Sequence, residues 1–204
     1  MNNFWQDVLS IKSTVETTIG IMGGSFNPPH SGHVYISNLA IKKLNLNFLL
    51  WLITPQNPLK DKSNLLDLSD RYKLCKKLTN NNYKIKISTL EKDLNSKYTF
   101  FTIQQLITTL PKHIKLIWIM GEDILYSFDK FYRWKDLTKL INIAIISRGG
   151  NNSFFSLRQK FSQIMEKHYI NNFEQLTELP SPSWGFFLLP KLTISSTIIR
   201  GKNN

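Results

Sequence analysis

Two histidines, His30 and His33, stand three residues apart in the stretch GIMGGSFNPPHSGH, which covers residues 20–33. The stretch joins an apolar run to an amphipathic run, which is typical of a turn between a buried strand and a helix. Gly23 and Gly24 would let a ligand approach the backbone more closely than a side chain allows. The helix that follows would direct free N–H groups and the positive end of its dipole to the same place, which predicts a phosphate-binding site.

The H-x-G-H spacing strengthens this interpretation. A Gly-Gly pair after a strand, taken alone, is more often an ordinary tight turn than a ligand site. We expect Gly32 to let the chain bend, so that the imidazoles of His30 and His33 face one ligand.

A second group of polar residues lies near the C-terminus in ISSTIIR, residues 194–200. Ser195 or Ser196 can cap a helix. The N–H groups of that helix, the Thr197 hydroxyl and the Arg200 guanidinium would together bind phosphate oxygens. Taken alone, an S-S-T sequence is more often a simple helix cap.

Short apolar runs alternate with amphipathic stretches, and these elements must position the polar residues. The runs predict strands at Ile19–Met22, Phe48–Thr54, Tyr83–Ser88, Ile114–Met120, Ile143–Ser147 and Phe186–Leu189. The stretches predict helices at Val34–Leu44, Leu68–Leu78 with Ser69 as N-cap, Thr99–Leu110 and Phe154–His168. This alternation indicates an α/β, Rossmann-like fold, with a doubly wound, mostly parallel sheet and helices on both faces. Ligands of such sheets bind beyond the carboxyl ends of the strands.

Length and composition fit one globular domain, because 204 residues that are 42% hydrophobic can bury a core. Residues 1–18 contain no continuous apolar segment and do not predict a secretory signal. The longest apolar run, residues 48–53, is too short to cross a bilayer. The single cysteine cannot form an internal disulfide, so we expect a cytoplasmic protein. We expect its helix to have an apolar side made of Tyr72, Leu74, Cys75 and Leu78.

The formal net charge of +12 suggests an anionic partner, which could be nucleic acid, a membrane surface or a phosphorylated small molecule. An equally good explanation is a general enrichment in Lys, Asn and Ile that has no function. The sequence has no arginine-rich block, RNP-like aromatic motif or Cys/His metal-ligand pattern, so we expect neither nucleic acid nor a membrane as partner.

The stretch GGSFNPPHSGH resembles the signature G-x-F-(D/N)-P-x-H-x-G-H of the nucleotidyltransferase superfamily, whose members move an adenylyl or cytidylyl group. The C-terminal ISSTIIR resembles the I-S-S-T-x-I-R of that superfamily, in the expected order and separation. Five segments between them resemble the nicotinate-nucleotide adenylyltransferase branch: WLITPQNPLK, YTFFTIQQL, WIMGEDIL, FYRWKDL and IISRGG. Asn27 stands where many relatives carry aspartate, and S-R-G-G stands where R-P-G is common. The match leaves residues 1–18 as an N-terminal extension without a role and residues 19–204 as a single nucleotidyltransferase domain.

The resemblance implies transfer of AMP from ATP to nicotinate mononucleotide, giving nicotinate adenine dinucleotide and pyrophosphate on the route to NAD. The acceptor's own phosphate oxygen would attack, without a covalent enzyme intermediate, because no motif resembles an activated protein nucleophile. Mg²⁺ would enter with ATP and needs few protein ligands, so no protein metal site is expected. The sequence does not determine whether the chain forms a homo-oligomer.

The resemblance also implies the residues of the site. The catalytic residues would be His30, His33 and Arg200. The ATP-binding residues would be Gly23, Gly24, Ser25, Phe26, His30, His33, Asp123, Arg148, Ser195, Ser196, Thr197 and Arg200. The acceptor-binding residues would be Lys60, Thr99 and Trp134.

Several of these residues have a competing structural interpretation. Asp123 would contact the ribose or adenine side of ATP, or would simply cap a helix. Lys60 would bind the acceptor phosphate, or would be one solvated lysine among many. Trp134 would stack on the pyridine ring or fill the core, and we favour stacking because its motif predicts a loop. Thr99 would meet the nicotinate carboxylate at a helix start.

Two other functions remain to be separated from this one. The first is a phosphopantetheine adenylyltransferase of the same superfamily, which the W-x-x-T-P-x-N-P-x-K and F-x-x-W segments disfavour. The second is a non-catalytic nucleotide-sensing or nucleic-acid-binding protein, which the intact His30, His33 and Arg200 disfavour.

Overall fold

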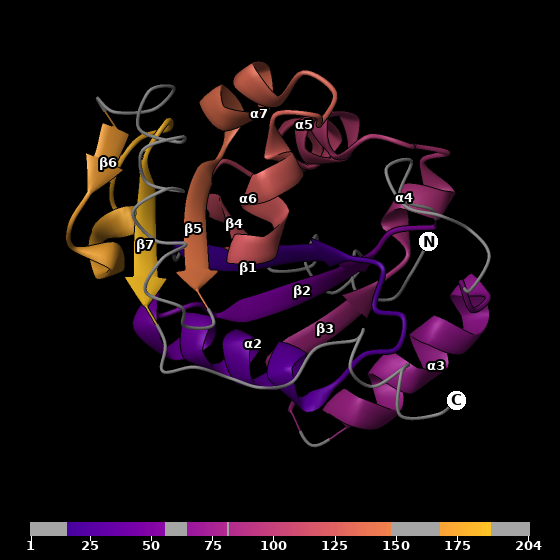
Figure 1. Cartoon of the computed structure of the whole chain (residues 1–204). Helices are drawn as coiled ribbons and strands as arrows, with labels where there is room; N and C mark the ends of the chain where they lie inside the picture. Colours follow the sequence, from indigo (N-terminus) through magenta and orange to yellow (C-terminus); the bar gives the residue numbers. More distant parts are fainter. Residues whose placement is uncertain (1–15, 56–64, 81, 148–167, 189–204) are drawn as a thin grey trace.

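The computed structural model describes residues 16–55, 65–80, 82–147 and 168–188. Seven strands form one sheet in the order β3-β2-β1-β4-β5-β7-β6, and every neighbouring pair is parallel (Figure 1). The strands are β1 (Thr17–Gly24), β2 (Phe48–Ile53), β3 (Ile85–Ser88), β4 (Ile114–Gly121), β5 (Asn142–Ser147), β6 (Tyr169–Ile170) and β7 (Trp184–Leu188).

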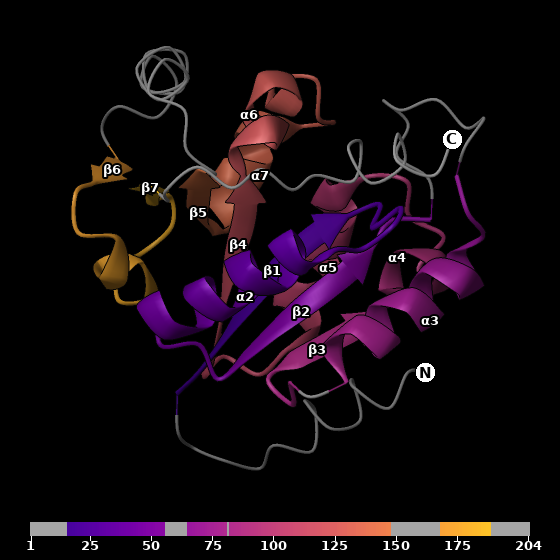
Figure 2. The same ribbon diagram turned by 60° about the horizontal axis from the view of Figure 1, so that its bottom comes forward.

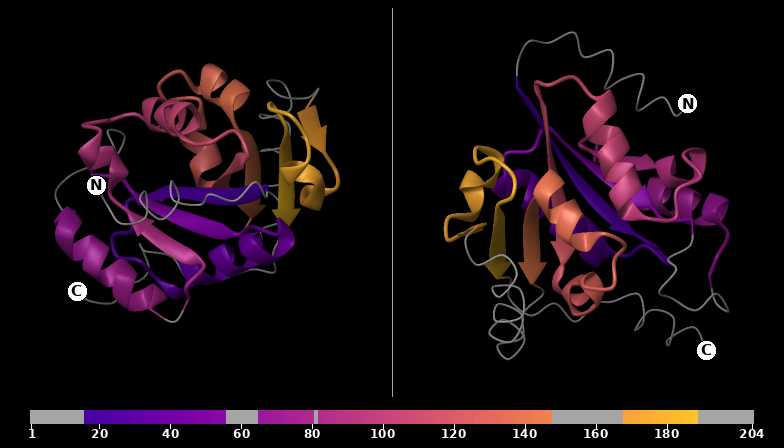
Figure 3. Two further views of the ribbon diagram at one scale, coloured as in Figure 1. Left: turned by 180° about the vertical axis from the view of Figure 1, so that it is seen from behind. Right: turned by 90° about the horizontal axis from the view of Figure 1, so that it is seen from above.

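Helices cover both faces of the sheet, which confirms the expected doubly wound α/β fold (Figures 2 and 3). The helices are α2 (Ser31–Lys43), α3 (Leu68–Thr79), α4 (Leu90–Asp93), α5 (Thr99–Thr109), α6 (Glu122–Phe128), α7 (Trp134–Leu140) and the 3-10 helix η2 (Phe173–Thr177). In Figure 1, α5, α6 and α7 lie above the sheet, and α2 and α3 lie below it. Within the described ranges, no helix is long and apolar enough to span a bilayer.

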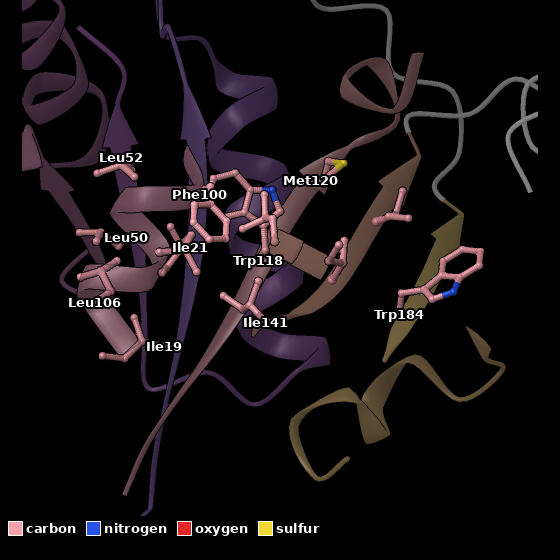
Figure 4. Packing of buried hydrophobic residues seen from close by; sticks show 14 of the residues in the cluster. Ile19, Ile21, Leu50, Leu52, Phe100, Leu106, Trp118, Met120, Ile141 and Trp184 are labelled. Carbon is pink, nitrogen blue, oxygen red and sulfur yellow. The ribbon is translucent and has the colours of Figure 1, made fainter. Parts of the chain in front are cut away.

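The two faces of the sheet carry separate apolar clusters. Alternate residues of a strand point to opposite faces, so Trp118 and Met120 of β4 join the cluster under α5, α6 and α7. Figure 4 shows these two side chains with Phe100 of α5 in that cluster. The intervening Ile119 belongs to the cluster on the opposite face, covered by α2, α3 and η2. Both faces of the sheet are therefore shielded from solvent, which explains why the strands are apolar at almost every position.

The strand order reverses at β1 and β4. From β1 the chain adds β2 and β3 on one side, and then β4, β5 and β7 on the other. In open parallel sheets a ligand binds at such a switch, beyond the carboxyl ends of the strands. The carboxyl ends here are Gly24 of β1 and Gly121 of β4, so the topology places the ligand beside the Gly-rich turn.

Several predicted element boundaries are wrong. β3 begins at Ile85, because residues 82–84 form a turn that leaves Tyr83 77% exposed. Asp67, and not Ser69, is the N-cap of α3, since the backbone N–H groups of the first turn bond to the Asp67 carbonyl. β7 begins two residues earlier than predicted, at the buried Trp184. β1 already includes Thr17 and Thr18, which we assigned to the extension. The predicted helix 154–168 lies almost wholly outside the described residues.

The helix α3 packs a narrower stripe against the sheet than we expected. Its buried residues are Arg71, Cys75 and Thr79, which follow one another at intervals of four. Leu74 and Leu78 are each 38% exposed, so they do not share the buried side with Cys75. Burial raises the pKa of the Cys75 thiol to about 12.

Candidate active site

The junction between β1 and α2 brings His30 and His33 together. His30 is the N-cap residue of α2 and has extended backbone angles, and His33 occupies the third helical position. Their ring centroids are 3.8 Å apart, so the structure brings the two imidazoles together, and their binding of one ligand stays a prediction. The proposed bend at Gly32 is wrong, because Gly32 lies inside the first turn of α2. The helix itself brings the two rings together.

A hydrogen bond fixes the ring of His33. The backbone N–H of His30 donates to Nδ1 of His33 over 3.1 Å. In a neutral imidazole with Nδ1 as acceptor, Nε2 carries the proton. His33 is therefore set up as a hydrogen-bond donor through Nε2. His30 is nearly buried, with 4% of its surface exposed, whereas His33 is half-buried.

Three side chains support His33, and the sequence analysis missed two of them, Trp51 and Ser37. The Trp51 indole N–H donates to Ser37 Oγ over 2.7 Å, and Ser37 Oγ donates to the His33 carbonyl over 2.7 Å. Phe26 stacks on Trp51 with centroids 4.7 Å apart and lies 5.0 Å from the His33 ring. Ser37 follows His33 by four residues, the spacing at which a helical hydroxyl bonds back to a carbonyl, and this signal was present in the sequence.

Phe26 has a positive φ of 46°, which is uncommon for a residue other than glycine. Its ring is 3% exposed, so packing against Trp51 and His33 offsets the backbone cost. The ring of Phe26 therefore packs against His33, and its predicted contact with ATP stays a prediction.

Gly23 is a glycine because of its neighbour in the core. A Cβ at Gly23 would lie 2.8 Å from an atom of the Trp118 ring. A Cβ at Gly24 would lie 3.2 Å from the Phe26 ring, which is a tight but smaller conflict. Close packing of aromatic rings thus requires small residues at Gly23 and Gly24. The approach of a ligand to the backbone would be a second reason for them.

Asn27 connects the Gly-rich turn to the segment before α3. Its Oδ1 accepts a hydrogen bond from the Leu66 backbone N–H over 3.1 Å. A carboxylate has the same oxygen acceptor, so the amide at this position keeps the contact that an aspartate could make.

Asp123 lies at the carboxyl end of β4, beside the Gly-rich turn in the sheet order. It is the second residue of α6 and is exposed, whereas Gly121 is the N-cap, so the helix-cap interpretation of Asp123 is wrong. Its neighbour Glu122 accepts a hydrogen bond from the Ser147 hydroxyl at the end of β5. Carboxylates therefore line this part of the edge.

Thr99 is the first residue of α5, as predicted. The helix runs back along the sheet toward the start of β4, so its N-terminus lies at the same edge as the carboxyl ends of the strands. Trp134 is the first residue of α7 and does not lie in a loop. It packs half-buried against the core, 6.0 Å from the Phe128 ring, which favours the core-filling interpretation.

Exposed aromatic rings beside Thr99 were missed by the sequence analysis. Tyr98 stacks on Tyr132 with centroids 4.6 Å apart, and Phe101 lies 5.5 Å from Tyr132. All three side chains are at least 40% exposed. They offer ring faces next to the start of α5, where Trp134 does not.

A buried carboxyl lies below the same edge. Glu91 of α4 is 3% exposed and forms a hydrogen bond with the Thr54 side chain, just after β2. Burial raises the pKa of Glu91 from its ordinary 4.5 to about 7, against the smaller effect of the Thr54 hydrogen bond.

Six predicted site residues lie outside the described residues: Lys60, Arg148, Ser195, Ser196, Thr197 and Arg200. Their roles stay predictions. Among the residues that the structure does describe, no three His, Cys, Asp or Glu side chains gather as a metal site.

Comparison with known proteins gives a family for this chain. Residues 21–202 match the family model described as Cytidylyltransferase-like. A protein of Agrobacterium fabrum named "Probable nicotinate-nucleotide adenylyltransferase" is 37% identical over 188 residues, covering 91% of this chain and 98% of its own. A protein of Brucella suis with the same name is 37% identical over 187 residues, covering 90% and 94%.

A solved structure has the same fold. The Plasmodium falciparum nicotinic acid mononucleotide adenylyltransferase complexed with NaAD superposes with a TM-score of 0.68, covering 91% of this chain and 83% of that one. Its sequence is 19% identical, so this likeness supports the fold alone. The sequence matches over nine-tenths of the chain show that it belongs to the cytidylyltransferase-like family and, within it, to the nicotinate-nucleotide adenylyltransferases.

Proposed function

We propose that this chain transfers AMP from ATP to nicotinate mononucleotide, forming nicotinate adenine dinucleotide and pyrophosphate in NAD biosynthesis. The observation that carries the proposal is the pair His30 and His33 at the start of α2, at the point where the strand order reverses. A helix N-terminus with two adjacent imidazoles suits the phosphates of a nucleotide.

The reaction needs no protein nucleophile. A phosphate oxygen of the mononucleotide attacks the α-phosphorus of ATP and forms a P–O bond. The bond from the α-phosphorus to the bridging oxygen of the β-phosphate breaks, and pyrophosphate leaves with the electron pair. The only cysteine is buried, with a pKa raised to about 12, and is a poor nucleophile. Catalysis then rests on positioning and on stabilising charge.

His33 has the best-defined part in this scheme. Its Nε2–H donor would bond to a phosphate oxygen of ATP, and its orientation is already set by the His30 N–H and by Ser37. We assign the second imidazole donor to His30. Mg²⁺ enters as part of the substrate Mg-ATP, because magnesium keeps several waters and needs few protein ligands.

The remaining assignments follow from the sequence motifs. Arg200, with Ser195, Ser196 and Thr197, would bind the leaving phosphates, and Arg148 and Asp123 would contact the nucleoside part of ATP. Lys60 would bind the acceptor phosphate and Thr99 its carboxylate. The pyridine ring would stack on Trp134, as its motif predicts, or on Tyr132, which is 44% exposed near the start of α5. The protein would act in the cytoplasm without nucleic acid or membrane.

A pyrophosphate-release assay with Mg-ATP and a panel of acceptors tests the proposal. We expect turnover with nicotinate mononucleotide and little with phosphopantetheine. If phosphopantetheine were the only acceptor to give turnover, the chain would be assigned to another branch of the superfamily. If the protein binds ATP but releases no pyrophosphate from it with any acceptor, a nucleotide sensor would be favoured instead.

A further inference from the structure

Arg71 of α3 has a buried guanidinium, with 1% of the residue exposed. It donates hydrogen bonds to four backbone carbonyls. Nε bonds to the carbonyl of Leu66 over 2.9 Å, and Nη2 bonds to that of Pro55 over 2.8 Å. Nη1 bonds to the carbonyls of Ser25 over 2.8 Å and of Thr54 over 2.7 Å. We call these five residues the Arg71 cluster.

The carbonyls of the cluster come from separate parts of the site. Ser25 lies in the Gly-rich turn after β1, five residues before His30 in the sequence. Thr54 and Pro55 follow the neighbouring strand β2 and lead toward Lys60. The two segments also touch directly, because the Thr54 N–H donates to the Gly24 carbonyl over 3.0 Å. Arg71 thus connects the turn proposed for ATP with the segment proposed for the acceptor.

Stability alone is a weak explanation for this arrangement. Within residues 16–55, 65–80, 82–147 and 168–188, no carboxylate forms an ion pair with Arg71. Burial lowers the pKa of its guanidinium, which reflects the cost of taking the charge out of water. An apolar side chain could fill the same volume without that cost, but it would leave the four carbonyls without these donors. Only a guanidinium has five donors in a rigid planar arrangement that can fix carbonyls from several segments at once.

We propose that Arg71 is a positioning residue for adenylyl transfer. It holds the turn after β1 and the segment after β2 in one relative position, so that ATP and the acceptor phosphate meet in line. This inference rests on the proposed function. When Arg71 is replaced, each substrate would still bind to its own segment. The attacking oxygen and the α-phosphorus would no longer be aligned. Replacing Arg71 should therefore lower kcat more than it changes either KM.

The first experiment uses Arg71→Lys, which keeps a positive charge but lacks the planar set of donors. Pyrophosphate release at varied ATP and varied nicotinate mononucleotide gives kcat and both KM values, and thermal melting reports the fold. We expect kcat to fall about 100-fold, while each KM changes by less than about threefold. Lys73→Ala removes an exposed charge from the same helix and should leave all three constants unchanged.

A second variant tests the guanidinium itself. Arg71→Ala leaves a space next to the four carbonyls, and millimolar methylguanidinium can occupy it. We expect methylguanidinium to restore part of kcat in this variant, and methylammonium at the same concentration not to do so. Neither cation should raise the kcat of the unaltered protein.

Three results would overturn the proposal. The first is Arg71→Lys with the kcat of the unaltered protein, whatever its melting temperature. The second is rescue of Arg71→Ala by methylammonium as well as by methylguanidinium, or by neither. The third is failure of both variants to fold, which would make Arg71 purely structural. If the unaltered protein itself releases no pyrophosphate, the proposed function fails first, and the inference fails with it.

Discussion

His33 is fixed through its backbone and its ring before any substrate arrives. Its backbone N–H donates to the His30 carbonyl, its Nδ1 accepts from the His30 N–H, and its carbonyl accepts from Ser37. Donors that are already oriented need no reorganisation when charge develops in the transition state. The orientation of His33 therefore also depends on its neighbours in the core, because Trp51 bonds to Ser37 and Phe26 packs 5.0 Å from the His33 ring.

Replacing His33 by alanine should leave the fold intact and lower kcat roughly 100-fold or more, which is the usual effect of losing a preorganised donor. Steady-state pyrophosphate release measures the change, with circular dichroism as the check on folding. Tyr35→Ala, at a 45% exposed position on the same helix, is the matched control. An unaltered kcat would remove His33 from the catalytic residues.

At the scale of the element, the start of α5 carries the proposed selectivity for the acceptor. Its first-turn N–H groups and the Thr99 hydroxyl are donors, and they lie at the positive end of the helix dipole. Such a place favours a carboxylate over a carboxamide, because the backbone N–H groups only donate and cannot pair with an NH₂ group.

The specificity constant kcat/KM should therefore be higher for nicotinate mononucleotide than for the nicotinamide form. Leaving one such group unmatched costs about 1 to 3 kcal/mol, so we expect a preference of roughly ten- to hundredfold. Thr99→Val should reduce this preference, and Thr99→Ser should keep most of it. Equal constants for both acceptors in the unaltered protein would contradict the assignment of Thr99.

The short helix α4 buries Glu91 close to the end of β2, and this makes stability depend on pH. A carboxyl whose pKa is higher in the folded than in the unfolded protein binds more protons when folded. The free energy of unfolding then falls as the pH rises from 4.5 to about 7, and stays level above that.

Glu91→Gln should remove this pH-dependent decrease in the free energy of unfolding. Relative to the unaltered protein, the variant should gain stability with rising pH up to about 7, to a limit of roughly 3 kcal/mol. Urea unfolding at a series of pH values measures the difference. Glu178→Gln, at an exposed position, controls for the loss of one negative charge. A difference that does not change with pH would mean that folding leaves the pKa of Glu91 unchanged.

At the scale of the whole molecule, both faces of one parallel sheet must be packed at once. Small residues in β1 make this possible where large side chains approach the strand. Gly23 faces the rigid ring of Trp118, whereas a Cβ at Gly20 would first meet the mobile end of Leu46, at 2.6 Å.

Gly23→Ala should therefore destabilise the protein more than Gly20→Ala does. Overpacking of a core costs about 1 to 3 kcal/mol, and we expect Gly23→Ala in the upper part of that range. The midpoint of urea unfolding compares the two variants directly. A larger loss for Gly20→Ala would mean that Trp118 moves aside more easily than Leu46.

The sequence was sufficient for the sheet and the histidine pair, because apolar strands and the H-x-G-H spacing are local signals. It was not sufficient for Arg71, since a charged residue on an amphipathic helix gives no sign that four distant carbonyls surround it. The expected loop at Trp134 was wrong for a similar reason: the residue begins α7 and packs near Phe128 of another helix, which the local motif does not show. The short elements α4, α6 and β6 hold too few residues to show a period.

The burial of Cys75 gives the protein a built-in reporter of unfolding. Burial raises the pKa of its thiol to about 12, so the reactive thiolate is scarce at pH 8, and the side chain is out of contact with solvent. An alkylating reagent should leave the native chain unlabelled and add one adduct to each unfolded chain, because the sequence holds a single cysteine. Mass spectrometry after a short pulse of iodoacetamide would then count unfolded molecules in any variant without a dye or a tag.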